Sequence, residues 1–164
     1  MTLMVIASVV AALCALGAGR AVPWQGKQAA VTMPLGMIAL AIPAAGVPAL
    51  LVAGLWVVSA MFGTIGLRGR PEAAGCCHRA LGAVAMTLCL LAGFGHGVAA
   101  GGHDAHGVGG ALPLLSGVAV LVVVVWSVVG MPNGRRGRAG LLLRAEVWAM
   151  TLGLIAMWLW HAVG

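Results

Sequence analysis

Long apolar runs, separated by short loops, constrain the fold of this chain more than any other feature. Of its 164 residues, 62% are hydrophobic and only 7% are charged. Soluble domains usually carry about 25% charged residues, because their surface must face water. So few charges cannot cover a water-facing surface, and we expect lipid to surround most of the chain. The length predicts one domain, residues 1–164, folded as an all-α integral membrane helix bundle.

Six apolar segments are expected to cross the membrane. A spanning helix needs about 20 residues, so the run over residues 29–66 is too long for one crossing. Gly46 and Pro48 at its centre supply turn chemistry, which divides the run in two. The first half contains Pro34 and Pro43, and we expect it to be kinked or tilted. The predicted spans are Thr2–Gly19, Ala29–Ala45, Pro48–Gly66, His78–Gly97, Ala111–Gly130 and Glu146–Val163.

Six crossings place all nine Lys and Arg residues on one side of the membrane. The positive-inside rule makes that side cytoplasmic, so both termini are expected on the non-cytoplasmic face of a cell membrane. The net charge of +6 then suits binding of the basic loops to anionic lipid headgroups, and we expect no nucleic-acid partner. The basic residues are Arg20, Lys27, Arg68, Arg70, Arg79, Arg135, Arg136, Arg138 and Arg144.

Four of the five histidines fall on the outer side in this topology. His96 ends the fourth span, His103 and His106 lie beside Asp104 in the following loop, and His161 ends the last span. Neutral imidazoles with a carboxylate suit Zn²⁺, Cu²⁺ or Ni²⁺, so these residues are candidate metal ligands. The alternative is a Gly-rich loop whose polar residues have no ligand role. His96 and His161 could also hold a haem axially.

The fourth span carries histidine, thiol and thioether side chains on one face. At about 100° per residue, His78, Cys89 and His96 share a narrow sector, with Met86 at its edge. Small residues on the same face allow another helix to pack closely. Cys and Met are also adaptable packing residues, which is the alternative interpretation. The small residues are Gly82, Ala85, Ala92 and Gly93.

The last span repeats this arrangement with Glu146, Met150, Gly153, Met157 and His161 on one helical face. A carboxylate near lipid is costly, so we expect Glu146 to face protein, water or a headgroup. Alternatively, Glu146 lies at the N-terminus of its helix, where the helix dipole favours a negative charge.

Soft sulfur ligands are distributed through the remaining spans. The cytoplasmic mouth of the fourth span offers Cys76, Cys77 and His78. Thioethers and thiols select Cu(I), and thiolate with imidazole also suits Zn²⁺. Together these residues predict a path for copper or zinc, unless the methionines only fill the core. The further sulfur residues are Cys14, Met33, Met37 and Met61.

The segment from His78 to Met86, followed by the Gly- and His-rich loop, resembles an uncharacterised actinobacterial family. Its members are small multi-pass membrane proteins rich in Met and His, and the rhythm of Glu146, Met150 and Met157 is similar to theirs. This chain has Gly82 where another Met is expected and Glu146 where a His is expected. The resemblance therefore implies location and architecture rather than a reaction.

Three classes of function remain open on the sequence. The first is a membrane protein that binds or transfers a transition metal. The second is a non-catalytic accessory subunit that packs against other membrane proteins through its Gly and Ala stripes. The third is a transporter or redox enzyme. Enzyme signatures such as Gly-x-Ser-x-Gly, His-Glu-x-x-His and the phosphate loop are missing, so we do not expect catalysis.

Overall fold

The computed structural model describes residues 2–41, 48–67, 69–70, 72–98, 111–130 and 137–163, without the side chains of 94–98 and 161–163. Within these residues the chain forms α-helices and one short 3-10 helix. The prediction of an all-α chain is confirmed. The elements are α1 (Thr2–Gly17), η1 (Gly19–Ala21), α2 (Trp24–Ala41), α3 (Ala49–Thr64), α4 (Ala73–Val98), α5 (Ala111–Val129) and α6 (Arg138–Val163).

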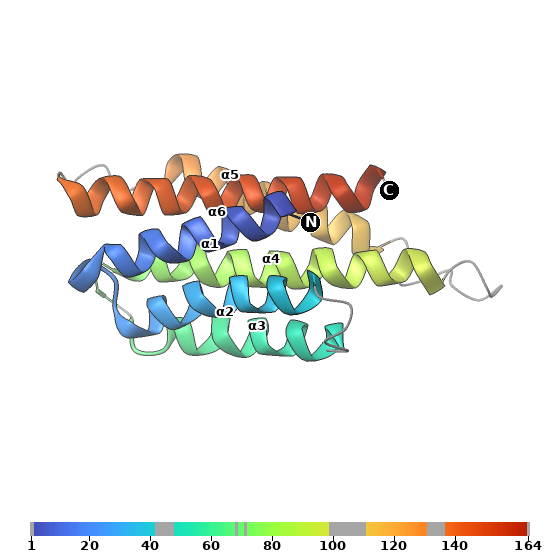
Figure 1. Ribbon diagram of the computed structural model, residues 1–164, viewed down its shortest axis with the longest axis horizontal. Coiled ribbons are helices and arrows are strands. Elements are labelled where there is room, and N and C mark those ends of the chain that lie inside the picture. The colour runs from blue at the N-terminus through green and yellow to red at the C-terminus, as the bar shows by residue number, and fades with distance from the viewer. Residues whose placement is uncertain are drawn as a thin grey trace.

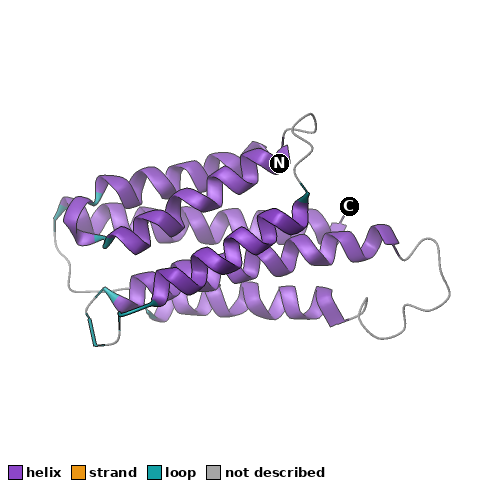
Figure 2. Cartoon of the chain, turned by 90° about the horizontal axis from the view of Figure 1, so that it is seen from below, coloured by secondary structure: helices purple, strands orange, loops and turns teal. Residues whose placement is uncertain are grey.

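The helices run alternately up and down along one common axis (Figures 1 and 2). Helix α4 lies in the middle and packs against α2, α3, α5 and α6. Helix α1 closes the bundle by packing against α2 and, most extensively, α6. The start of α1 and the end of α6 both lie toward the same end of the molecule (Figure 1).

The helix boundaries differ from the predicted spans mainly at the charged end. The division of residues 29–66 into two helices is confirmed, with α2 and α3 side by side. However, α2, α4 and α6 begin at Trp24, Ala73 and Arg138, several residues before the predicted starts. The early turns contain good helix formers, namely Gln and Lys in α2, Ala in α4, and Leu and Arg in α6, so each helix begins before its predicted span. Helix α2 also continues through Pro34.

Three helices are long and apolar enough to cross a membrane: α4 over Ala73–Gly93, α5 over Ala111–Val129 and α6 over Arg138–Trp160. Helices α1 and α3 are equally apolar in character but have 16 residues each. Large hydrophobic side chains are exposed along α1, α3, α5 and α6, for example Leu13, Leu50, Leu121 and Leu152. This exposed apolar surface is what a membrane protein presents to lipid.

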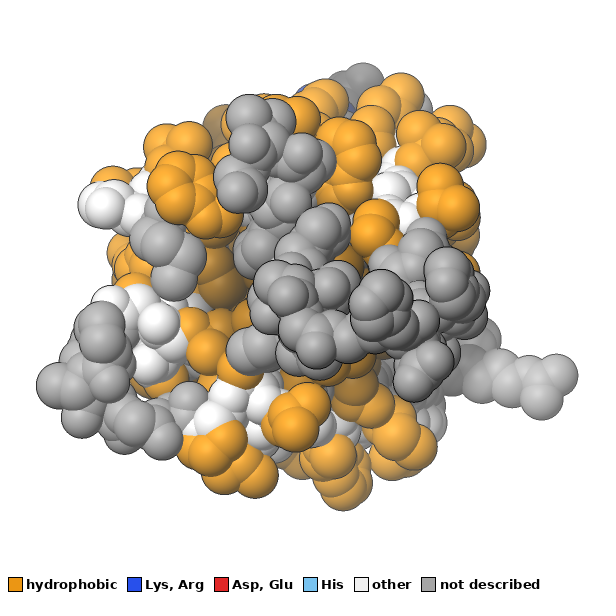
Figure 3. Space-filling model, turned by 90° about the vertical axis from the view of Figure 1, so that its right-hand side faces the viewer, with side chains coloured by type: hydrophobic (Ala, Val, Ile, Leu, Met, Phe, Trp, Pro, Cys, Tyr) orange, Lys and Arg blue, Asp and Glu red, His pale blue; other side chains and the backbone are white. Residues whose placement is uncertain are grey.

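The basic side chains of the described residues lie at one end of the bundle. Arg20 follows α1, Lys27 is in the first turns of α2, and Arg70 precedes α4. Arg79, Arg138 and Arg144 lie in the early turns of α4 and α6 at the same end. Figure 3 faces the opposite end, where the coloured side chains nearest the viewer are hydrophobic or uncharged. Arg68, Arg135 and Arg136 lie outside the described residues.

Polar contacts and a glycine fix the packing of α2 against α3. The fully buried Trp56 donates from its indole Nε1 to the carbonyl oxygen of Thr32, at 3.2 Å. The hydroxyls of Thr32 and Ser59 are hydrogen-bonded at 2.9 Å. The indole rests on Gly36, where a Cβ would lie 2.6 Å from Nε1 and 2.8 Å from Cγ1 of Val52. Only glycine therefore permits this close approach.

We predict that Gly36→Val destabilises the protein. The added side chain would displace an indole that is held by a hydrogen bond, and overpacking of this kind costs about 1–3 kcal/mol. Thermal unfolding in detergent measures the effect.

The matched control is Gly54→Val on α3, where a Cβ meets nothing within 4 Å. Equal unfolding temperatures for the two variants would contradict the prediction.

Candidate functional site

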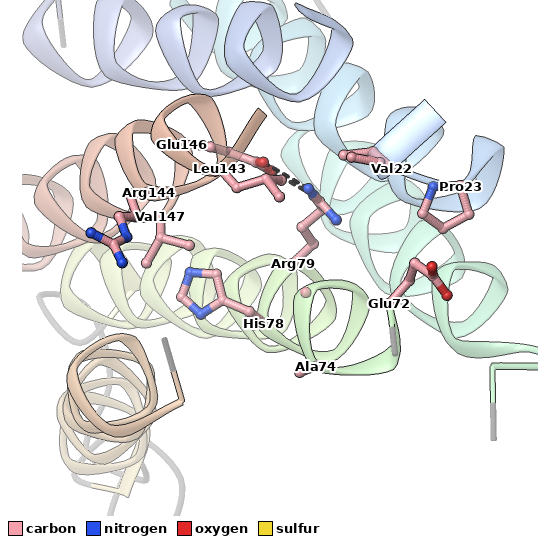
Figure 4. Close-up of a pocket in the computed structure, with 13 residues that line it drawn as sticks. Val22, Pro23, Glu72, Ala74, His78, Arg79, Leu143, Arg144, Glu146 and Val147 are labelled. Atoms are coloured by element: carbon pink, nitrogen blue, oxygen red, sulfur yellow. Dashed lines mark hydrogen bonds and ion pairs between the residues drawn. The ribbon is translucent and has the colours of Figure 1, made fainter. Parts of the chain in front are cut away.

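A buried ion pair joins α4 to α6 near the basic end. Arg79 is only 3% exposed and Glu146 only 4%. The guanidinium donates from Nε to Oε1 of Glu146 at 2.5 Å and from Nη2 to Oε2 at 2.7 Å (Figure 4). This two-point geometry is the strongest arrangement for an arginine and a carboxylate. It satisfies both charges inside the protein, where an unpaired charge would be very costly.

The position of Glu146 decides between the two sequence interpretations. Helix α6 begins at Arg138, so Glu146 lies well inside the helix and not in its first turn. The interpretation that the helix dipole stabilises Glu146 at a helix N-terminus is therefore wrong. The carboxylate instead faces protein, as the cost of burying it predicts.

Gly26 on α2 has no side chain and thereby leaves room for the guanidinium of Arg79. At Gly26 on α2, a Cβ would lie 3.0 Å from Nη1 of Arg79 and 3.3 Å from Sγ of Cys76. The guanidinium and the buried thiol of Cys76 thus both lie against the backbone of α2. Any larger residue at position 26 would press on the ion pair.

His78 is the most unusual group at this end. It is 4% exposed, and neither Nδ1 nor Nε2 has a hydrogen-bond partner among the described residues. A neutral imidazole carries one donor and one acceptor, and buried polar atoms are normally hydrogen-bonded. The ring projects from α4 toward the side of α6 that carries Arg144 and Val147 (Figure 4). A buried imidazole without a partner among the described residues is unusual, and a bound water, ion or ligand would explain it.

Two hollows meet at His78. The larger lies between the α1–α2 connection, the start of α4 and the start of α6. It has about 70 Å³ of room for water-sized molecules, and about 700 Å³ when the open mouth is included. The smaller lies between α4, α5 and α6, and is also lined by Trp126, Ser127 and Gly130. Ser127 in turn is hydrogen-bonded to Thr151 of α6 at 2.8 Å.

Away from this end, the interior contains a group of sulfur side chains that we name the methionine core. Its members are each at most 5% exposed, come from α1, α2, α4 and α6, and belong to one hydrophobic cluster that all six α-helices share. Met150 lies so close to α4 that a Cβ at Gly82 would be 2.2 Å from its Cε. The methionine core is Met4, Met33, Met37, Met86, Met150 and Met157, together with Cys89.

The predicted residues at the inner mouth of the fourth span do not converge. Cys76 lies against α2, whereas His78 faces the hollows beside α5 and α6. Successive residues of a helix point about 100° apart, which separates Cys76, Cys77 and His78. Among the described residues, His, Cys, Asp and Glu form no group of three or more that could hold a metal ion. All four cysteines are free, Cys14 is half-buried, and Met61 is 65% exposed on α3.

The four histidines predicted on the outer side have no described side chain. His96 and His161 lie near the ends of α4 and α6, which reach the same end of the bundle (Figure 1). Their side chains lie outside the described part of the structure, as do His103, Asp104 and His106 altogether. The predicted outer metal site therefore stays a prediction.

The sequence analysis missed the pairing of Arg79 with Glu146. Both residues were recognised separately, Arg79 as a topology signal and Glu146 as a costly carboxylate. The signal that could have joined them is the small number of acids: with three in the chain, one in an apolar span needs a basic partner on another helix.

Comparison with known proteins finds no matching family model, no matching curated protein and no matching solved structure. The resemblance to an actinobacterial family accordingly stays a prediction.

We predict that Glu146→Gln alone strongly destabilises the protein, because it leaves the Arg79 guanidinium buried without a counter-charge. Breaking a buried pair from one side typically costs about 3–5 kcal/mol. The double variant Arg79→Met with Glu146→Met should regain most of that loss, since apolar residues of similar volume replace the pair. Unfolding in detergent, followed by circular dichroism, measures all three proteins.

Arg144→Gln serves as the control, because Arg144 is an exposed arginine on the same helix. Its effect should stay below about 1 kcal/mol. A double variant at least as unstable as Glu146→Gln would contradict the prediction.

Proposed function

We propose that this protein is a six-span integral membrane protein of the cell membrane with its basic end in the cytoplasm. Three observations support the proposal: the helices alternate in direction, their outer surfaces are apolar, and the described basic residues gather at one end. The positive-inside rule then assigns that end to the cytoplasm and both termini to the other face.

The short helices fit this proposal with a modest adjustment. A helix of 16 residues is about 24 Å long, compared with about 30 Å for the hydrocarbon layer. Flanking residues and local thinning of the bilayer accommodate such a difference at low cost. Helices α1 and α3 also pack beside longer neighbours, α6 and α4 respectively, which complete the thickness of the bundle.

Cysteine labelling tests the topology. In a variant with the four native cysteines replaced by Ala, we place single cysteines at residues 2, 27 and 138. An impermeant maleimide added to intact cells should label the Thr2→Cys protein, and should label Lys27→Cys and Arg138→Cys only after permeabilisation. Labelling of residues 2 and 27 from the same side would refute the six-span arrangement.

For the function, we propose that the protein binds or transfers a soft transition metal, with copper favoured over zinc. The observation that carries this proposal is the methionine core, in which six thioethers and one thiol from four helices lie in a single buried cluster. Thioether and thiol sulfur are the side chains that select Cu(I). The sequence adds His96, His103, His106 and His161 as the proposed outer entry site.

The bulk of this cluster also has a packing role, because Met fills irregular spaces in cores. The metal proposal adds that the thioethers of α4 and α6 act as ligands as well. Met150 and Met86 are central to it, since Met150 presses directly on α4 at Gly82. A test must therefore remove sulfur while keeping volume.

The triple variant Met86→Leu, Met150→Leu and Met157→Leu should bind much less copper than the wild type. Leu keeps nearly the same volume, so the fold should persist while the thioethers are lost. Protein in detergent is incubated with Cu(I) under ascorbate and desalted, and copper per chain is measured by mass spectrometry. His96→Ala and His161→Ala test the outer site in the same way.

Met61→Leu is the matched control, because Met61 is 65% exposed on α3 and lies outside the methionine core. Equal copper content in the wild type, the triple variant and the control would contradict a role for the core. Equal content in the two histidine variants would contradict the outer site.

A non-catalytic accessory subunit is the second candidate. Helix α5 favours it, since only 22% of this candidate span is buried, compared with 50% for α4. Its exposed aliphatic face could pack against a helix of another membrane protein as well as against lipid. Wild-type protein that binds no copper in the experiment above would favour this function. The exposed residues are Leu114, Leu115, Val118, Leu121, Val122, Val125, Val128 and Val129.

A further inference from the structure

The charged side chains that line the larger hollow at the basic end have a net charge of zero. Its lining contains two arginines, Arg79 and Arg144, and two glutamates, Glu72 and Glu146. Arg79 and Glu146 are bound to each other through two hydrogen bonds, so their charges are already neutralised. A ligand with a net charge would gain little from such a wall and would lose its own hydration.

His78 offers this pocket two buried nitrogen atoms that can form hydrogen bonds with a ligand. The ring is buried, both nitrogens are unpartnered within the described residues, and it lines both hollows. A neutral imidazole can donate to a carbonyl oxygen through one nitrogen and accept from a hydroxyl through the other. A neutral group that carries such an oxygen would satisfy it.

The remainder of the lining is apolar. Val22 and Pro23 come from the α1–α2 connection, and Leu143 and Val147 come from α6 (Figure 4). Ligand sites typically combine such apolar walls with a few polar groups that fix orientation. The pocket has about 70 Å³ of room for water-sized molecules, which admits the polar end of a ligand, and it is partly open to the outside.

We propose that this pocket binds a neutral amphiphile with a ring carbonyl or hydroxyl oxygen, of the quinone type, and that His78 holds that oxygen. Such a molecule dissolves in a bilayer, which surrounds the bundle in the proposed six-span arrangement. The pocket is separate from the methionine core, so this proposal is independent of metal binding.

Binding of decylubiquinone to purified protein in detergent tests the proposal. The wild type should bind one molecule per chain saturably, as measured by equilibrium dialysis against detergent of equal concentration. His78→Leu should weaken binding about tenfold, the typical effect of one lost hydrogen bond. His78→Gln, which keeps a donor and an acceptor, should bind more tightly than His78→Leu. Val147→Trp, which fills the pocket, should abolish binding.

Ser116→Ala is the control. Ser116 lies near the start of α5, whereas the hollows lie near its end, so this variant should bind decylubiquinone like the wild type. Decanoate, an anion of the same chain length, should not compete. The proposal is overturned by absent saturable binding, by equal affinity in His78→Leu and the wild type, or by effective competition from decanoate. Circular dichroism of each variant distinguishes loss of the fold from loss of the site.

Discussion

The ion pair between Arg79 and Glu146 is the interaction on which the arrangement of the basic end depends. It joins α4, the helix against which four others pack, to α6, the main partner of α1. Because both charges are buried, neither residue can be removed alone without leaving an uncompensated charge. The pair thereby sets the register of α6 along α4. That register places Met150 against Gly82, and Gly153, about one turn further along α6, lies close to Ala7 of α1.

Other helix interfaces use a similar device with neutral groups. Ser127 of α5 is hydrogen-bonded to Thr151 of α6, and Thr32 of α2 is hydrogen-bonded to Ser59 of α3. In each pair at least one hydroxyl is also bonded to a carbonyl of its own helix, so the polar atoms are satisfied locally. Where lipid surrounds a bundle, hydrophobic burial does not select between helix pairings, and small residues and hydroxyls take over that selection. The cavity at His78 differs because its imidazole has not been satisfied in this way.

Much of the helical layout could be predicted from apolar runs, and the charge distribution supported the division at Gly46 and Pro48. The starts of α4 and α6 could not, because both helices begin several residues before the segments that the apolar pattern marks, at Ala73 and Arg138. Burial of Met86, Cys89, Met150 and Met157 followed from helical periodicity and is confirmed. The contact of Arg79 with Glu146 joins residues 67 positions apart, and periodicity within one helix carries no information on such a pairing. That His78 has no hydrogen-bond partner within the described part of the chain likewise depends on the neighbouring helices.

The contacts between α2 and α3 have a consequence for how the protein is made. Trp56 finds its acceptor on Thr32, and the Thr32 hydroxyl finds its partners on Ala29 and Ser59, all within one pair of consecutive helices. The pair therefore needs nothing from the later chain to satisfy these groups. In the proposed six-span arrangement, the pair could enter the bilayer as a closed hairpin while the ribosome is still synthesising α4. Helices α2 and α3 would then form a preassembled pair against which the later helices pack.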